Sequence, residues 1–170
     1  MNFFLKISRL IDFINTKIGQ SAQIFTIALV CVQFTVVVLR YIFGYNSTFM
    51  QESVVWMYGI MVFLSASWAY ILDRHVRVDV AYQGFSKKGK ALANLFGCVF
   101  LLLPLLIVLW VYIFPYVIYS WSLWETSPEI DGIPAVFILK SFLLIFVGLL
   151  FMQMISECIK NLHIYLSNKG

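Results

Sequence analysis

The sequence predicts an all-α membrane protein whose four transmembrane helices form one integral domain over residues 1–170. Of its 170 residues, 62% are apolar and only 12% are charged. Soluble domains carry roughly 25% charged residues, so this chain cannot cover a water-facing surface, and disorder would require low hydrophobicity. The chain also contains four long runs almost free of charge. These runs are continuous, whereas the strands of a membrane β-barrel alternate over short segments.

Residues 1–17 are expected to form an amphipathic helix in the inner-leaflet interface. Charged and amide residues fall between apolar residues that recur at helical spacing: Phe3, Phe4, Ile7, Leu10, Ile11 and Ile14. This pattern is typical of an interfacial helix. A cleavable signal is not expected, because the apolar run that follows is too long and lacks a small-x-small cleavage site.

The predicted spans cover about residues 18–40, 53–72, 91–118 and 133–156, and each approaches or exceeds the 20 or so residues that a crossing needs. The backbone must bond internally in hydrocarbon, so each span is expected to be a helix. The third is expected to be kinked by Pro104 and Pro115, with a Tyr- and Trp-rich outer end in the interface. The fourth is expected to continue as a helix into the cytoplasm.

Loop charge predicts the orientation. Ten of the twelve Lys and Arg residues precede the first span, follow the fourth, or lie between the second and third. The two other connections hold one cation against four carboxylates: Arg40 against Glu52, Glu125, Glu129 and Asp131. The positive-inside rule therefore places both termini in the cytoplasm.

Several kinds of chemistry are not expected. The only histidines, His75 and His163, fall in predicted cytoplasmic segments, whereas haem and metal sites in bundles need ligands on facing helices. No carboxylate lies near the middle of a span, and there is no glycine-rich phosphate loop or CxxC pair. The basic middle loop is explained by topology and contact with phospholipid rather than by nucleic acid. We therefore expect no catalytic residues, no cofactor and no metal.

Ionisable residues at membrane depth are candidates for function. Arg40 and Glu52 stand at the outer ends of consecutive spans, where they pair with each other or with a neighbouring chain, unless Arg40 extends to the headgroups. Lys140 lies about two turns inside the fourth span. It either extends outward or pairs with Glu129, Asp131 or a partner's carboxylate.

Residues Arg40 to Val80 resemble the signature of the small membrane subunit of TRAP transporters (tripartite ATP-independent periplasmic transporters, DctQ type). The shared features are an Arg closing the first span, an acid opening the second, a small-residue stretch and an H-x-R-V-D-like segment: Arg40, Glu52, Phe63 to Ala66, His75, and Arg77 to Asp79. Many members have a Trp and two acids before the second span. Here Phe49 and Gln51 occupy the Trp and first acidic positions, which leaves Glu52 alone.

The resemblance implies a non-catalytic small permease subunit of a sodium-coupled transporter in the bacterial inner membrane. Members work with a large membrane subunit that carries the substrate and sodium sites. A periplasmic substrate-binding protein delivers an organic acid such as a C4-dicarboxylate or a sialic acid. The separate, unfused length of this chain is similar to the small subunits of sialic acid systems. Its expected role is a scaffold for the large subunit that also helps dock the binding protein.

Two sets of candidate residues follow. The candidates for the partner interface are Arg40, Glu52, Asp73, His75, Arg77, Asp79 and Lys140. The candidates for periplasmic docking are Tyr45, Asn46, Glu125, Glu129 and Asp131. Two other functions remain open, an anchor or assembly subunit of a membrane enzyme complex and a self-sufficient small exporter.

Overall fold

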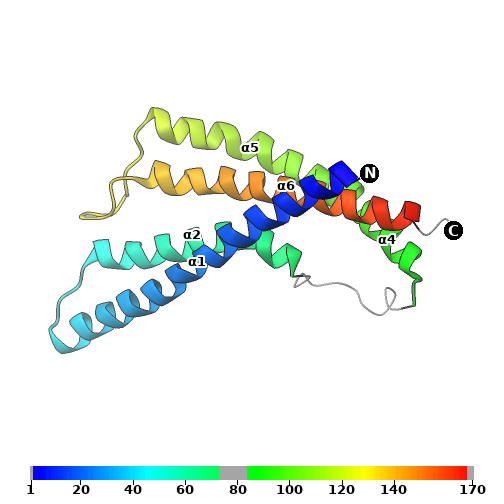
Figure 1. The fold of residues 1–170 in the computed structure, drawn as a ribbon. Helices are drawn as coiled ribbons and strands as arrows, with labels where there is room; N and C mark the ends of the chain where they lie inside the picture. Colours follow the sequence, from blue (N-terminus) through cyan, green and yellow to red (C-terminus); the bar gives the residue numbers. More distant parts are fainter. Residues whose placement is uncertain (1, 73–83, 168–170) are drawn as a thin grey trace.

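The computed structural model describes residues 2–72 and 84–167, and these ranges are almost entirely helical (Figure 1). In chain order the elements are α1 (Asn2–Ile42), α2 (Thr48–Ile71), α4 (Lys87–Phe96), the π-helical segment η1 (Gly97–Leu102), α5 (Leu103–Ser122) and α6 (Val136–Ser167). Because α4, η1 and α5 follow without a break, they form one 36-residue helix. The described part of the chain thus contains four helices long and apolar enough to span a membrane, which confirms the predicted fold class.

Helix α6 lies at the centre of the arrangement. It packs against α1, α2, α4 and α5, while α1 and α2 also pack extensively on each other. Helix α5 lies on one side of α6, with α1 and α2 on the other side (Figure 1). The first turn of α1 and the last turn of α6 lie at the same end of the bundle, as an even number of spans requires.

Helix α1 runs for 41 residues without interruption. At about 1.5 Å per residue it is about 60 Å long, roughly twice the thickness of the hydrocarbon layer. The expected interfacial helix and the first span are therefore parts of a single helix. In its first turns most large apolar side chains are exposed: Phe3, Phe4, Leu10 and Phe13. Ser8, Ile11 and Asn15 are buried against the other helices.

The third membrane helix changes its pitch just before Pro104. Proline lacks the N–H that would bond the carbonyl four residues earlier. The chain adopts a π-helical turn at this point, in which the N–H of Leu103 bonds the carbonyl of Cys98, five residues back. Pro115 lies inside α5 without ending it.

Close backbone approach holds α1 to α2. A Cβ atom on Gly19 of α1 would lie only 2.3 Å from the Cβ of Trp68 on α2, so only glycine fits at this crossing. Lipid tails already surround apolar side chains, and association within a membrane therefore depends on tight packing and on polar contacts between helices. Tight packing also joins α6 to the η1–α5 segment, through a small apolar cluster of Cys98, Leu106, Val147 and Met154.

Candidate partner and docking surfaces

A buried polar cluster joins the first turns of α1 to the last turns of α6. Oδ1 of Asp12 accepts hydrogen bonds from Ser156 Oγ at 2.7 Å and from Gln153 Nε2 at 2.9 Å. Oδ2 of Asp12 lies 2.7 Å from Lys160 Nζ. Asn15 Nδ2 donates to Gln153 Oε1 at 2.8 Å. We call this group the Asp12 cluster and define it as Ser8, Asp12, Asn15, Gln153, Ser156 and Lys160.

The Asp12 cluster places Asp12 and Asn15 against another helix of the chain. Both residues turn toward α6, and Asn15, Gln153 and Ser156 have 0% of their surface exposed. The sequence of α6 contained a pattern that indicates this contact. Gln153, Ser156 and Lys160 recur three and four residues apart and so share one helix face. A polar stripe on an apolar helix indicates a polar stripe on the helix packed against it.

Charged residues occur on α6 at two levels. Lys140 and Lys160 lie 20 positions apart in the sequence, which corresponds to about 30 Å along a helix. This distance matches the thickness of the hydrocarbon layer. The Asp12 cluster therefore belongs to one membrane boundary and Lys140 to the other, where the docking candidates also lie.

Glu52 joins the outer end of α2 to the loop between α5 and α6. Its carboxylate accepts hydrogen bonds from Ser127 Oγ and from the backbone N–H of Ile133, the latter at 2.6 Å. Arg40 is exposed and forms no ion pair with any residue in the described ranges. The structure thus does not contain the direct Arg40–Glu52 pair that the sequence left open.

Replacing Glu52 by glutamine is expected to free the loop between α5 and α6. The amide cannot accept from both donors with the strength of a carboxylate, because hydrogen bonds to charged groups are the stronger ones. Amide hydrogen exchange at residues 127–133 should become several-fold faster. Arg40→Gln is the matched control, and an equal effect of that variant would show that Arg40 and Glu52 act together after all.

Lys140 is bonded within the chain, and its partner differs from those expected. Its ammonium group pairs with the carboxylate of Glu125, which also accepts from Ser120 Oγ at 2.6 Å. The Lys140 Nζ lies 4.1 Å from the centroid of the Tyr116 ring. Glu129 and Asp131, the expected internal partners, are exposed instead. The chain reverses at Trp124, whose φ is 49°, and this turn brings Glu125 back toward α6.

The Glu125 contact makes the outer loop sensitive to acid. Hydrogen bonds from Lys140 and Ser120 hold the pKa of the Glu125 carboxyl below its ordinary value of 4.5. A lowered pKa means that the stabilisation is complete above pH 4.5 and is lost as the pH falls through the folded-state value. Tryptophan fluorescence from Trp121 and Trp124 should therefore change below pH 4.5. Glu125→Gln should remove this step, and an unchanged acid profile in that variant would contradict the assignment.

The exposed outer loops contain most of the docking candidates. Tyr45 is 59% exposed, and Asn46 accepts a hydrogen bond from Gln51 in the first turn of α2. Ile130 is 87% exposed at the tip of the α5–α6 loop, between the exposed acids Glu129 and Asp131. Four partner-interface candidates lie outside the described residues: Asp73, His75, Arg77 and Asp79.

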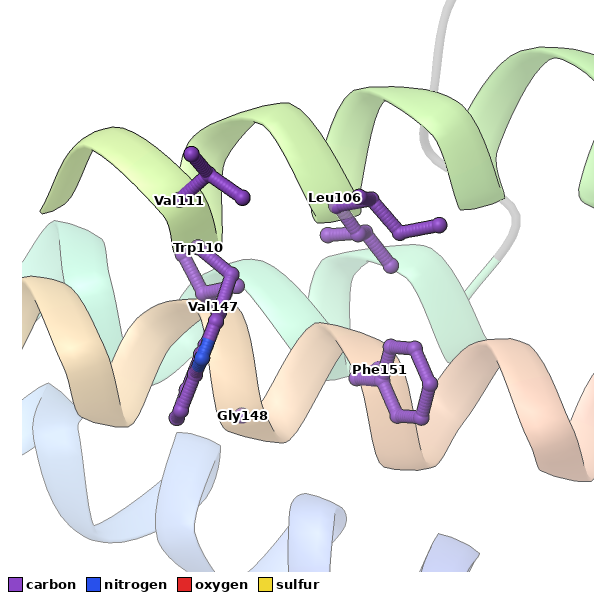
Figure 2. Close-up of a pocket in the computed structure, with 7 residues that line it drawn as sticks. Leu106, Trp110, Val111, Val147, Gly148 and Phe151 are labelled. Carbon is purple, nitrogen blue, oxygen red and sulfur yellow. The ribbon is translucent and has the colours of Figure 1, made fainter. Parts of the chain in front are cut away.

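An apolar groove lies along the surface between the packed helices α5 and α6 (Figure 2). Its volume is about 400 Å³, and its walls are Leu106, Ile107, Trp110, Val111, Val147 and Phe151. Gly148 of α6 forms part of the lining, and a Cβ atom there would meet nothing within 4 Å. Because α5 packs mainly on α6, most of its remaining surface is free to contact lipid or another helix. The described residues contain no group of three or more His, Cys, Asp or Glu that could hold a metal ion.

A comparison with protein families identifies a matching family. The model described as "Tripartite ATP-independent periplasmic transporters, DctQ component" matches residues 29–163. The matched region extends from the middle of α1 into the last turns of α6, and it includes Arg40, Glu52 and Lys140. Searches of curated proteins and of solved structures return no match.

Proposed function

Since the chain belongs to the DctQ component family of the tripartite ATP-independent periplasmic transporters, we propose that it is the non-catalytic scaffold subunit of such a transporter. A large membrane subunit would carry the substrate and sodium sites, and a periplasmic binding protein would deliver an organic acid, either a sialic acid or a C4-dicarboxylate. The complex would lie in the bacterial inner membrane with both ends of this chain in the cytoplasm.

The observation that supports the proposal is that charged groups at both ends of the bundle bond parts of this chain to one another. At one boundary the Asp12 cluster holds α1 to α6. At the other, Glu52 and Glu125 bind the α5–α6 loop to α2 and α6. Between these levels the helices carry no charged side chain over residues 18–39, 53–71, 91–122 and 141–156. Polar groups that fix helices in place support a rigid frame, whereas a substrate path would require unoccupied polar groups near the midplane.

The large subunit contacts the α5–α6 face in this proposal. Helix α5 is bound mainly by α6, and the groove beside it offers a hollow into which a row of side chains from another helix fits. The binding protein, in contrast, contacts an exposed acidic surface, the tip of the α5–α6 loop at Ile130 with Glu129 and Asp131 beside it. Such a contact is expected to be weak and to depend on salt.

Co-purification from mild detergent tests the scaffold role. The wild-type chain should bring down a larger membrane protein, and proteoliposomes that contain both subunits should accumulate an organic acid when given the binding protein and a sodium gradient. Gly148→Trp, which fills the groove, should weaken co-purification. Val30→Trp, at an exposed position of α1, is the matched control. Uptake by proteoliposomes that contain this chain alone would refute the proposal.

A further inference from the structure

A second groove lies between α1 and α2 at their outer ends. It has a volume of about 410 Å³. Arg40 and Gln51 line its outer part, and the valines at positions 36, 37, 54 and 55 line the part closer to the membrane centre. From the outer end inward, the lining thus runs from Arg40 and Gln51 through the four valines to Gln33, which lies about one helical turn deeper than Val37.

Arg40 has no anionic partner within the described part of the chain. The nearest candidate in sequence, Glu52, is bonded to Ser127 and to the backbone of Ile133. A guanidinium group always carries its charge and presents five N–H donors in a planar fork. Beside a groove at the membrane boundary, this group is expected to bind an anion, and its geometry fits a phosphate or a carboxylate.

We propose that this groove is a phospholipid-binding site. The phosphate binds Arg40, and an acyl chain lies along the four valines. The order of polarity supports a lipid over an acidic protein side chain. A charged head at the boundary followed by an apolar stretch toward the midplane is the order found in a lipid, whereas an isolated carboxylate would leave the valines without a complementary surface.

Native mass spectrometry of the full chain in mild detergent tests this site, with phosphatidylglycerol as the added probe. The wild type should retain one bound lipid, and Arg40→Gln should weaken binding at least about tenfold, because charge-assisted hydrogen bonds are lost. Val55→Trp fills the apolar part while keeping the charge, and it should weaken binding as well. Arg9→Gln removes an exposed cation from the other end of α1 and should leave binding unchanged. Diacylglycerol, which lacks the phosphate, should not bind.

Two results would overturn the proposal. One is equal binding of diacylglycerol and phosphatidylglycerol, which would leave Arg40 without a role in recognition. The other is an Arg40→Gln variant that binds lipid like the wild type but no longer co-purifies with the large subunit, which would assign Arg40 to a carboxylate of that subunit. If Arg40→Gln does not fold, Val55→Trp decides the matter. The measurement uses this chain alone, so its outcome is independent of the test of the scaffold role.

Discussion

Gly19→Val is expected to separate α1 from α2 and to lower the stability of the bundle. The first added carbon would lie 2.3 Å from Trp68 Cβ and 2.8 Å from its Cγ. These atoms are close to the backbone, so a change of side-chain rotamer cannot relieve the overlap. Overpacking of this kind costs about 1–3 kcal/mol and sometimes more. The unfolding midpoint in detergent measures the effect.

Two controls distinguish the overlap from a general effect of adding a side chain to a membrane helix. Gly148→Ala places a Cβ where no other atom lies within 4 Å. This variant should be neutral or slightly stabilising, since alanine favours a helix over glycine by about 1 kcal/mol. Replacing Trp68 by alanine in the Gly19→Val background should restore part of the loss. Independent, additive losses would show that the two residues are not in contact.

Asp12→Ala is expected to detach the N-terminal half of α1 from α6. The Nε2 amide of Gln153, which has 0% exposure, would lose its acceptor, while Ser156 would keep its contacts with Ser8. Lys160 would lose one of its two carboxylate partners. A buried donor left without a partner costs about 1–3 kcal/mol. Hydrogen exchange of residues 3–17 should accelerate more than that of the rest of α1.

The exposed carboxylate Glu129 provides the comparison for Asp12. Glu129→Ala should change the free energy of unfolding by no more than about 0.5 kcal/mol, as is usual for surface substitutions. The double variant Asp12→Ala/Lys160→Met should lose less stability than the sum of the losses in the two single variants, because each single change already breaks the same ion pair. Equal unfolding midpoints for Asp12→Ala and Glu129→Ala would show that the Asp12 cluster does not hold the helices together.

The presence of four helices long and apolar enough to span a membrane was predictable because hydrocarbon excludes charge. The same reasoning could not reveal that residues 1–17 continue into the first span, since Lys17 marks a change in composition and not a break in the backbone. Pro104 indicated an irregularity in the third helix. Its form, a π-helical turn over Gly97–Leu102, could not be read from the proline alone.

The polar contacts were harder to predict for a physical reason. In a soluble protein the apolar face of a helix usually marks the side that packs on the core. In a membrane, lipid also solvates apolar side chains, so the periodicity of α1 does not show which face contacts other helices. The sequence therefore did not show that Asp12 and Asn15 face α6. The partner of Lys140 was missed because Glu129 and Asp131 are closer to it in sequence. Only the left-handed turn at Trp124 brings Glu125 to α6 instead.

The uninterrupted course of α1 has a mechanical consequence. A polypeptide with a joint between its cytoplasmic segment and its first crossing could let one end shift while the other stays still. Here a single uninterrupted helix runs between the two ends of the bundle, held near its middle by Trp68 and near its start by α6. A tilt imposed on one end of α1 must therefore move its other end as well, so the two ends of the bundle are mechanically coupled.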